Sequence, residues 1–395
     1  MQFKTRPGDF IVQELARLPL SPEGDFAIYR VEKEGVTTLK VQIHIAAQLG
    51  RRNADVQAPA LKDKHATVTQ YLAVRGAGPP ELSGPGYHAQ FIGRSRRPLR
   101  PGDLEGNRFT VILRDLASEQ TEGVREQLNQ VDRYGLPNYY DEQRFGSYIT
   151  NPSAPDRFMG KTILRRDAAG AVRAYLGYSF RNDPRHVRKF KRVARQHWGE
   201  WAYLLDVAPR PSNYRSVLTY LKDHPEGYRK ALNLIPRRLL SLFLVAYQSY
   251  LWNKIAGAYL DTLLEAGADL LRMEMLDLSL PWYPELAEVG RATLSATEVA
   301  LPGHRAVYRD AQLWQVVKKV LVEEGLRLND LKARILKRAY LPKGSRSLLL
   351  HPADVSLEAV EPEGFVAVPM VQHIGAPAAP VVKKKDEVKK GELIG

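Results

Sequence analysis

The strongest constraint on the fold of this chain is a change in hydrophobic pattern near residue 153. Before that point, four short segments carry β-branched and aromatic residues in partly alternating order and are bounded by Gly, Pro or Asp, which is typical of β-strands. The predicted strands are residues 10–14 (FIVQE), 26–33 (FAIYRVEK), 66–74 (ATVTQYLAV) and 108–113 (RFTVIL). After it, helical patterns predominate. The sequence therefore predicts an α+β protein with more than one domain.

One helix is predicted within the strand-rich part. The hydrophobic residues of 39–49 (LKVQIHIAAQL) fit either a helical or a strand period. We predict a helix because Thr37 or Thr38 could cap its start and Gly50 could close its end. The Gly/Pro-rich stretch 76–86 (GAGPPELSGPG) is predicted to be a loop.

The second part of the chain shows several helix signals. Asp183 and Pro184 give an N-cap followed by a proline at the first helical position. Pro236 opens a long amphipathic run that ends near Gly267, and a further helix is predicted over residues 311–324.

Charge and composition narrow the possible partners. The 395 residues include 58 Lys and Arg against 44 Asp and Glu, which gives a formal net charge of +14 and a pI near 9.7. Such a balance favours a polyanionic partner, and nucleic acid is the leading candidate. A membrane surface is the competing interpretation, but the most apolar run, residues 239–252, is interrupted by polar residues and is shorter than the roughly 20 residues of a spanning helix.

Several classes of chemistry find no support in the sequence. The N-terminus has no apolar segment of the kind that marks export, so we expect a cytoplasmic protein. The chain has no cysteine, its nine His residues show no metal-ligand spacing, and it has no P-loop or Rossmann glycine pattern. We therefore expect no cofactor and no metal.

Seven segments in collinear order carry a family resemblance that extends to about residue 360. They are DFIVQE (9–14), KEGVTT (33–38), LKDKHATVTQ (61–70), RRPLRPGDLEGNRF (96–109), PNYYDEQRFG (137–146), QSYLWN (248–253) and LPG (301–303). Together they resemble the TruD family of tRNA pseudouridine synthases. Three positions depart from the usual pattern: Ala60 stands in place of glycine, Thr37 in place of asparagine and Tyr140 in place of phenylalanine.

The resemblance implies an enzyme that converts a uridine in structured RNA to its C-glycoside isomer without a cofactor, with uridine 13 of tRNA as the expected target. It also implies a mixed-sheet catalytic domain that is interrupted by a mostly helical insertion domain. We therefore predict the catalytic domain at residues 1–153, the insertion domain at 154–345, a catalytic return segment at 346–368 and an atypical basic tail at 369–395.

Asp63 falls where the family has its catalytic aspartate. Because isomerisation breaks the N-glycosidic bond, turns the base and reattaches it through carbon 5, a carboxylate there can act as nucleophile or as base. If the register of the following strand extends backward, Lys62 and Lys64 point away from Asp63, since side chains alternate faces. Lys62, Lys64 and His65 are therefore predicted to bind the RNA substrate, and the cation that pairs with Asp63 is expected elsewhere. A solvated turn is the alternative.

The segment 137–146 alternates aromatic rings with amide and guanidinium groups, which suits a pocket that stacks a flipped base and hydrogen-bonds its edge. The predicted substrate-binding residues in it are Asn138, Tyr140, Gln143, Arg144 and Phe145. Tyr140 stands where the family usually has phenylalanine. A ring of the same shape should still stack, while its hydroxyl needs a partner if it is buried. The alternative is an ordinary aromatic turn.

A basic helix is predicted within PRHVRKFKRVARQHW (184–198). Its basic residues recur at helical spacing on one face, and these are Arg185, Arg188, Lys189 and Arg192. The opposite side carries the residues that can pack, Val187, Phe190, Ala194 and Trp198. The basic face is predicted to contact RNA phosphates, with a merely solvated face as the alternative. A second basic cluster, with the same ambiguity, consists of Arg94, Arg96, Arg97 and Arg100.

The C-terminal tail does not follow the family pattern. Residues 369–395 (PMVQHIGAPAAPVVKKKDEVKKGELIG) resemble the N-terminal region of the C subunit of Rnf-type electron-transport complexes, where HIGAPA precedes a lipoyl-like β-hairpin module. A gene fusion, a misassembled reading frame and a coincidental basic tail are all compatible with this. We therefore expect the last family strand to be absent and the tail to contribute little to the catalytic core.

The sequence thus predicts a TruD-like tRNA pseudouridine synthase, with tRNA as its partner, no membrane association and no nucleotide cofactor. We expect a monomer. The main alternative is a non-catalytic RNA-binding protein on the same scaffold. A weaker one, based on the tail alone, is an interaction subunit of a redox complex.

Overall fold

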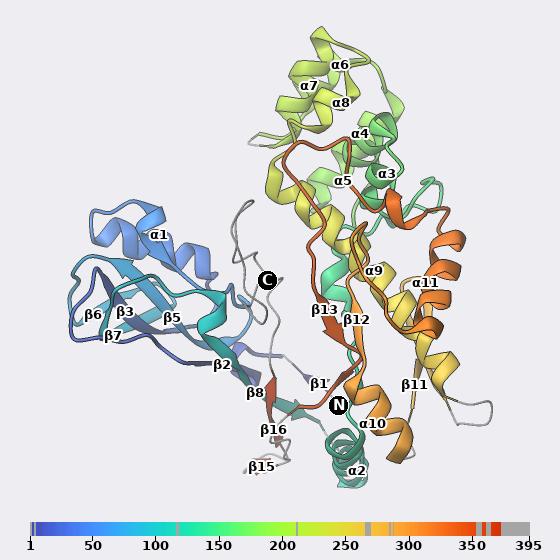
Figure 1. Ribbon diagram of the computed structural model, residues 1–395. Helices are drawn as coiled ribbons and strands as arrows, with labels where there is room; N and C mark the ends of the chain where they lie inside the picture. The colour runs from blue at the N-terminus through green and yellow to red at the C-terminus, as the bar shows by residue number, and fades with distance from the viewer. Residues whose placement is uncertain are drawn as a thin grey trace. The chain divides into compact units, whose positions relative to one another are not determined.

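The chain divides into two compact units, which are described separately. The computed structural model describes residues 2–3, 5–115, 118–210, 212–264, 270–283, 286, 288–352, 358–360 and 365–372. For residues 2–3, 118–120, 288–290, 358–360 and 365–372 it describes the backbone alone. Unit 1 holds the described residues within 1–136 and 351–377, and unit 2 those within 137–350 (Figure 1).

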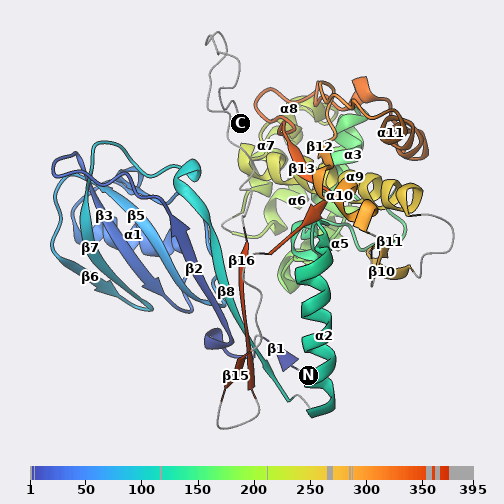
Figure 2. The same ribbon diagram turned by 60° about the horizontal axis from the view of Figure 1, so that its bottom comes forward.

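Unit 1 is built on a mixed sheet. Its strands are β1 (Gln2–Phe3), β2 (Phe10–Ala16), β3 (Phe26–Lys33), β4 (Val56–Gln57), β5 (Thr67–Arg75), β6 (Glu81–Gly84), β7 (Tyr87–Ser95), β8 (Leu104–Arg114), β15 (Glu358–Val360) and β16 (Phe365–Gln372). Their order is β15-β16-β8-β2-β5-β3-β7-β6, with β1 paired to β8 and β4 to β5. The β2–β5 pair is parallel and the neighbouring pairs are antiparallel (Figure 2). The four predicted strands are confirmed as β2, β3, β5 and β8.

Helix α1 (Thr38–Gln48) covers one face of this sheet (Figure 2). Its predicted start is confirmed, because the Thr37 hydroxyl accepts a hydrogen bond from the Lys40 N–H at 3.3 Å. The helix buries Val41 and Ile45 against residues of one face of β3, such as Tyr29. The ambiguous period of 39–49 is thereby resolved as helical: Val41, Ile45 and Ala46 are buried, while Leu39 and Ile43, which a strand would place on the same face as Val41 and Ile45, are exposed.

The stretch predicted to be a loop, 76–86, contains strand β6. Leu82 is the buried side chain of this strand, and its backbone pairs with Ala89 of β7. The prediction was wrong because the stretch offers only one apolar side chain between two Gly/Pro clusters, which is too little for an alternating pattern. Pairing with β7 supplies what the local sequence lacks.

The expectation that the last strand is absent was also wrong. Strand β16 pairs antiparallel with β8 over Val366–Gln372, so the first four residues of the predicted tail belong to the sheet. Pro369 obscured this strand, because a proline cannot donate to a β ladder and weakens a strand prediction. It lies opposite Thr110, beyond the residues of β16 that pair with β15. Residues 373–395, the rest of the predicted tail, lie outside the described residues.

Unit 2 is mostly helical. Its helices are α3 (Met159–Leu164), α4 (Ala168–Gly177), α5 (Arg185–Gln196), α6 (Trp201–Val207), α7 (Tyr214–Asp223), α8 (Tyr228–Leu232), α9 (Arg237–Leu263), α10 (Glu288–Ala296) and α11 (Ala311–Glu323). Three small two-stranded pairs join them: β10 (Leu271–Met275) with β11 (Leu278–Trp282), β12 (Glu298–Ala300) with β13 (Ser345–Ser347), and β9 (Leu136–Pro137) with β14 (Leu349–Leu350).

The remaining elements are one helix of unit 1 and five short 3-10 turns. They are α2 (Ser118–Tyr134), η1 (Pro7–Asp9), η2 (Asn53–Asp55), η3 (Pro101–Asp103), η4 (Glu142–Phe145) and η5 (Leu328–Asp330). The predicted helices that begin after Pro184 and Pro236 and near residue 311 are confirmed as α5, α9 and α11. Asp183 is not the cap that the sequence suggested, because its carboxylate instead pairs with Lys191 at 2.7 Å.

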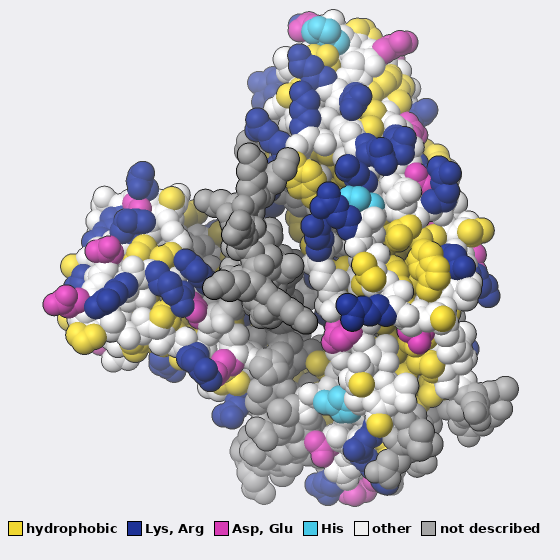
Figure 3. Space-filling model, viewed as in Figure 1, with side chains coloured by type: hydrophobic (Ala, Val, Ile, Leu, Met, Phe, Trp, Pro, Cys, Tyr) yellow, Lys and Arg dark blue, Asp and Glu magenta, His cyan; other side chains and the backbone are white. Residues whose placement is uncertain are grey.

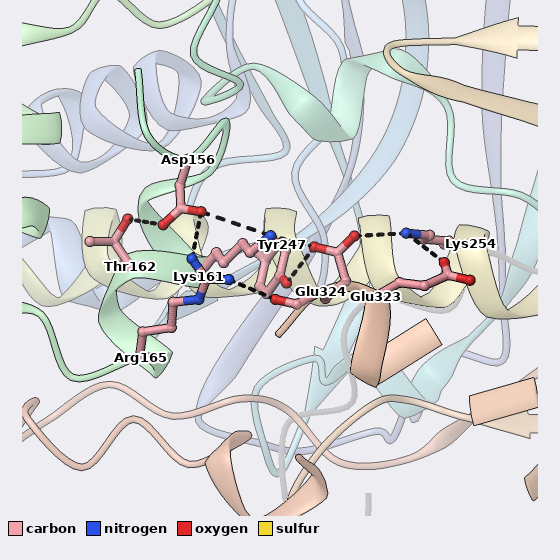
Figure 4. Close-up of polar contacts among 8 residues, drawn as sticks. All are labelled: Asp156, Lys161, Thr162, Arg165, Tyr247, Lys254, Glu323 and Glu324. Atoms are coloured by element: carbon pink, nitrogen blue, oxygen red, sulfur yellow. Dashed lines mark hydrogen bonds and ion pairs between the residues drawn. The ribbon is translucent and has the colours of Figure 1, made fainter. Parts of the chain in front are cut away.

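An ionic cluster joins α3, α9 and the end of α11 inside unit 2 (Figure 4). Glu324 accepts hydrogen bonds from Lys161 at 2.7 Å, Lys254 at 2.9 Å and the Tyr247 hydroxyl at 3.0 Å. Burial alone would raise the pKa of Glu324, but the two ammonium groups outweigh it and hold that pKa below its usual value. The cluster therefore holds these helices together with its charges compensated.

The compact units divide at other positions than the boundaries predicted at 153/154 and 345/346. Residues 137–153 and 346–350 group with unit 2. Arg346 explains part of this, because its guanidinium donates to the Asn138 carbonyl at 2.8 Å and so joins the two segments. The predicted boundaries came from a change in composition, which marks where the helices begin. The compact units instead depend on contacts between distant segments, such as the one between Arg346 and Asn138.

We predict that a chain ending at Val368 unfolds several degrees below a chain ending at Gln372. The four residues between these ends pair with β8, and each backbone hydrogen bond contributes about 0.5–1.5 kcal/mol net. Thermal unfolding of both truncations measures the difference, and the longer one controls for loss of residues 373–395. Equal midpoints would show that the end of β16 adds nothing to stability.

Candidate active site

Asp63 lies in a turn between η2 and β5. Residues 61–66 form neither a helix nor a strand, so the alternation of β5 does not continue back to Asp63. The His65 N–H donates to the Asp63 carboxylate at 3.0 Å, which is the local geometry of an Asx turn. The carboxylate is thus oriented by its own backbone, and its side chain is half-buried.

A buried cation reaches Asp63 from the end of β3. Lys33 is 2% exposed, and its ammonium donates to the Val36 carbonyl at 3.1 Å and to the Asp63 carbonyl at 2.5 Å. Burial lowers the pKa of Lys33 to about 8, the Asp63 charge acts to raise it, and Lys62 acts to lower it. Lys33 is therefore a cation close to Asp63 that the sequence did not reveal, held through the main-chain carbonyl of Asp63.

The prediction that Lys62 faces the RNA was wrong. Its side chain is 6% exposed and pairs with Glu14 at 2.9 Å, and its ammonium also donates to Asn107 at 2.7 Å. Burial raises the pKa of Glu14, and the charge of Lys62 opposes that rise. The prediction failed because it extended the strand register through a turn.

The backbone of the same loop is fixed as well. The Lys62 N–H donates to the Thr38 hydroxyl at 3.1 Å, and that hydroxyl donates to the Gln70 side chain at 3.0 Å. Thr38 is the first residue of α1, so the loop is anchored to both the helix and β5. Lys64 and His65, by contrast, are exposed. Both are accessible to a ligand, and their predicted contact with RNA stays a prediction.

In unit 2, two guanidinium groups lie close to the ring of Tyr140. Arg346 lies 4.3 Å from its ring centroid and Arg144 lies 5.0 Å from it, while Trp252 meets the ring edge-on at 5.7 Å. Burial lowers the pKa of Arg346, and the neighbouring Tyr140 acts against that shift. A half-buried aromatic ring beside two cations can stack a base near a phosphate.

Asn253 holds the backbone of Tyr140. It is fully buried on α9, its amide accepts from the Tyr140 N–H at 2.8 Å, and it donates to the Tyr140 carbonyl at 2.8 Å. Both backbone groups of one residue are thus satisfied by one side chain. The arrangement fixes where the ring of Tyr140 can lie.

The other predicted residues of 137–146 fall into different environments. The Asn138 amide donates to the Ser347 carbonyl at 2.9 Å and accepts from Arg346, so it positions the chain. Gln143 is exposed and accessible to a ligand. Phe145 is fully buried and packs against Phe158, so its predicted contact with substrate is wrong and it belongs to the core.

The basic face of α5 has the predicted geometry. Arg185, Arg188, Lys189 and Arg192 are exposed, while Val187, Phe190 and Ala194 are buried. Figure 3 shows Lys and Arg side chains gathered over a neighbouring part of unit 2, around α6, α7 and α8. Arg188 also donates to the Asp183 carbonyl at 2.8 Å. Phosphate binding by this face stays a prediction.

The second predicted basic cluster is partly structural. Arg97 makes two hydrogen bonds to Asp103, at 2.8 and 2.6 Å, and Arg94 donates to the Gly24 carbonyl at 2.9 Å. These two guanidinium groups hold the chain around β7 and η3. Arg96 and Arg100 remain exposed.

Among the described residues, no group of three or more His, Asp or Glu side chains is arranged to hold a metal ion. Likewise, no described helix combines the length and the hydrophobicity needed to cross a membrane.

Comparison with known families identifies the family of this chain. A model of the family described as tRNA pseudouridine synthase D (TruD) matches residues 1–367. The chain belongs to the TruD family. A relative named tRNA pseudouridine synthase D from Aquifex aeolicus is 27% identical over 363 residues, which cover 90% of this chain and 91% of the relative. A relative from Methanopyrus kandleri is 30% identical over 360 residues, covering 88% and 83%.

The fold is that of a solved TruD structure. A crystal structure from Methanosarcina mazei superposes with a TM-score of 0.70 at 21% identity, covering 95% of this chain and 91% of that one. A second family model, the RnfC barrel sandwich hybrid domain, matches residues 351–395. The predicted double resemblance is therefore confirmed, and the second match overlaps the end of the TruD match.

The TruD motifs of unit 2 meet on α9. Besides Asn253, the Trp252 indole donates to the Val299 carbonyl at 3.1 Å, and Gln248 donates to the Pro302 and Pro342 carbonyls at 2.9 and 2.8 Å. The motif at 248–253 therefore positions two other motifs, 137–146 and 301–303. In the sequence, this role is indicated by polar residues, Gln248 and Asn253, on a long and otherwise apolar helix.

Two functional candidates were missed by the sequence. Lys33 could have been found, because alternation along β3 places it on the same face as Ala27, Tyr29 and Val31, which are fully buried. Arg346 had no such local signal, since only the fold brings it to Tyr140.

We predict that Asn253→Ala destabilises unit 2 by roughly 2–4 kcal/mol, because it leaves both backbone groups of Tyr140 unpaired in a buried place. Chemical denaturation measures this. Ser249→Ala, one turn earlier on α9 and equally buried, is the matched control and should cost much less. Equal costs for the two variants would mean that the contact with Tyr140 is not what Asn253 contributes.

Proposed function

We propose that this TruD-family chain isomerises uridine 13 of tRNA to pseudouridine and that Asp63 carries the reaction. The observation that supports this most is the environment of Asp63. Its carboxylate is oriented by a turn and half-buried, and the buried ammonium of Lys33 donates to the main-chain carbonyl of the same residue. A carboxylate held in one orientation in this way is placed to act as a nucleophile or a base.

The reaction moves the sugar from one base atom to another. The bond between N1 of uracil and C1′ of the ribose breaks, the base turns, and a bond forms between C5 and C1′. The proton on C5 is lost and N1 gains one, so the product is an isomer of the substrate. Asp63 as nucleophile would hold C1′ or the base while it turns, and as base it would accept the C5 proton.

Other residues would hold the substrate. Tyr140, with Arg144 and Arg346 over its ring, is proposed to stack a flipped base. Lys64, His65 and the basic face of α5 are proposed to contact phosphates, which agrees with the net charge of +14. We also propose that the protein acts as a cytoplasmic monomer.

Asp63→Asn is expected to lower pseudouridine formation on a tRNA transcript to background. The variant keeps the size and shape of the side chain but removes its charge and its nucleophilic oxygen. Filter binding should show unchanged or tighter RNA affinity, because a negative charge that faces a polyanion is gone. Asp25→Asn is a suitable control, since Asp25 is exposed beside the opposite end of β3 from Lys33.

Substantial turnover by Asp63→Asn would contradict the catalytic assignment. If the wild type binds tRNA but shows no turnover either, the chain is the non-catalytic RNA-binding protein that the sequence left as its alternative. A variant that fails to fold would make Asp63 a structural residue, which thermal unfolding detects.

Lys33 gives the reaction a predicted pH dependence. With a pKa of about 8, its ammonium loses the proton as pH rises through that value, and the positive charge beside Asp63 disappears. We expect kcat/KM of the wild type to fall above about pH 8 and Lys33→Met to lose roughly 10- to 100-fold at neutral pH, without that alkaline fall. A profile of Lys33→Met that matches the wild type would contradict a role for this charge.

A further inference from the structure

Unit 2 contains a cavity of about 390 Å³ between residues 300–307 and 331–344. Its volume lies in the range of roughly 300–1,000 Å³ that small-ligand sites occupy. The walls are tied together: the Leu301 N–H donates to the Gly344 carbonyl at 2.9 Å, and the His304 N–H donates to the Leu331 carbonyl at 3.2 Å. The cavity is therefore held open by the backbone of its own walls.

Helix α9 holds the two walls of the cavity together. One amide group, that of Gln248, donates to the carbonyls of both Pro302 and Pro342, one from each wall. Figure 1 shows the segment from α11 to β13 passing over α9. A buried polar side chain that bridges two loops fixes their spacing. The motif LPG (301–303), to which the site around Tyr140 gives no role, forms part of this wall.

The cavity carries uncompensated positive charge. Arg305, Lys332 and Lys343 line it and are exposed, and within the described part of the chain none has a carboxylate within 4.0 Å. The surrounding sequence adds to this, because residues 331–352 include six Lys and Arg and no Asp or Glu. Burial and then these three cations lower the pKa of His304. An anionic ligand would relieve the repulsion.

An exposed aromatic ring completes the cavity. Tyr340 is 66% exposed, and its hydroxyl donates to the Lys337 carbonyl at 3.1 Å, which holds the ring in place. Val307, on the opposite wall, is 72% exposed. A ring presented to solvent beside several cations matches the way that proteins bind unpaired nucleotides, by stacking the base and neutralising the phosphate.

The cavity lies next to the site around Tyr140 in the same unit. Strands β12 and β13 connect the two, because Ala300 and Gly344 are in the cavity wall and Arg346, in β13, lies over Tyr140. From Lys343 to Arg346 is three residues, or about 10 Å of extended chain. The two sites are therefore neighbours but separate.

We propose that this cavity binds a second, unpaired nucleotide of the RNA substrate, distinct from the uridine that is modified. Its phosphate meets Arg305, Lys332 and Lys343, and its base stacks on Tyr340. The inference rests on the proposed function in that it takes RNA as the substrate. It adds a subsite that selects RNA with a further unpaired nucleotide.

The test compares two double variants with the same loss of charge. Lys332→Ala with Lys343→Ala removes cations of the cavity, whereas Arg334→Ala with Arg338→Ala removes exposed cations of the same segment that do not line it. We expect the cavity variant to raise KM and weaken filter binding of tRNA at least several-fold more than the control, with kcat unchanged. Thermal midpoints should stay close to wild type, since all four residues are exposed.

Variants of Tyr340 test the contribution of stacking separately from that of charge. Tyr340→Ala should weaken tRNA binding by roughly 5- to 100-fold, and Tyr340→Phe should stay close to wild type because it keeps the ring. Equal binding by the two double variants, or wild-type binding by Tyr340→Ala, would overturn the subsite. The binding ratios test the subsite even if the wild type shows no turnover, so failure of the proposed function is distinguishable from failure of this inference.

Discussion

The buried ion pair between Lys62 and Glu14 is the interaction on which the candidate active site depends. Taking both charges out of water is costly, and removing one partner of such a pair typically costs about 3–5 kcal/mol. Two further hydrogen bonds support the pair: Lys62 donates to Asn107, and Glu14 accepts from the Tyr71 N–H. Because Lys62 precedes Asp63 directly, this pair fixes an otherwise irregular loop at the residue next to the carboxylate.

The two lysines near Asp63 have different tasks. Lys62 is neutralised by Glu14 and serves the loop. Lys33 donates to the carbonyl of Asp63 and leaves its positive charge beside the carboxylate. Burial lowers the pKa of Lys33 to about 8, which makes the charge of this ammonium sensitive to mild alkali. Asp63 thus lies in a loop that two lysines hold, one through the main-chain carbonyl of Asp63 and one through Glu14.

In unit 2, buried neutral amides fix the position of loops, as the buried pair of Lys62 and Glu14 does in unit 1. Helix α9 is apolar over most of its surface, yet it buries Gln248 and Asn253, whose amides bond to backbone groups of other segments. A buried amide without partners would be costly, so these contacts restrict the segments to one position. The proposed stacking site around Tyr140 and the cavity at residues 300–307 and 331–344 therefore share one support.

Much of the fold could be predicted because it depends on local periodicity. The alternation in β2, β3, β5 and β8 and the caps of α1 and α9 are visible in short windows. Strands β6 and β16 could not be predicted, because one is too short to show a pattern and the other contains Pro369. Their pairing with β7 and β8 compensates for weak local signals.

The sequence by itself determined the family, the α+β class and the position of Asp63, since seven ordered motifs and the hydrophobic periods do not depend on folding. Only the tertiary structure decided which charge meets which. The atoms that join Lys33 to Asp63, Lys62 to Asn107 and Gln248 to Pro342 come from residues 30, 45 and 94 positions apart. The local sequence around a lysine does not show whether its ammonium is solvated or buried in an ion pair. Its partner depends on which distant segments pack together.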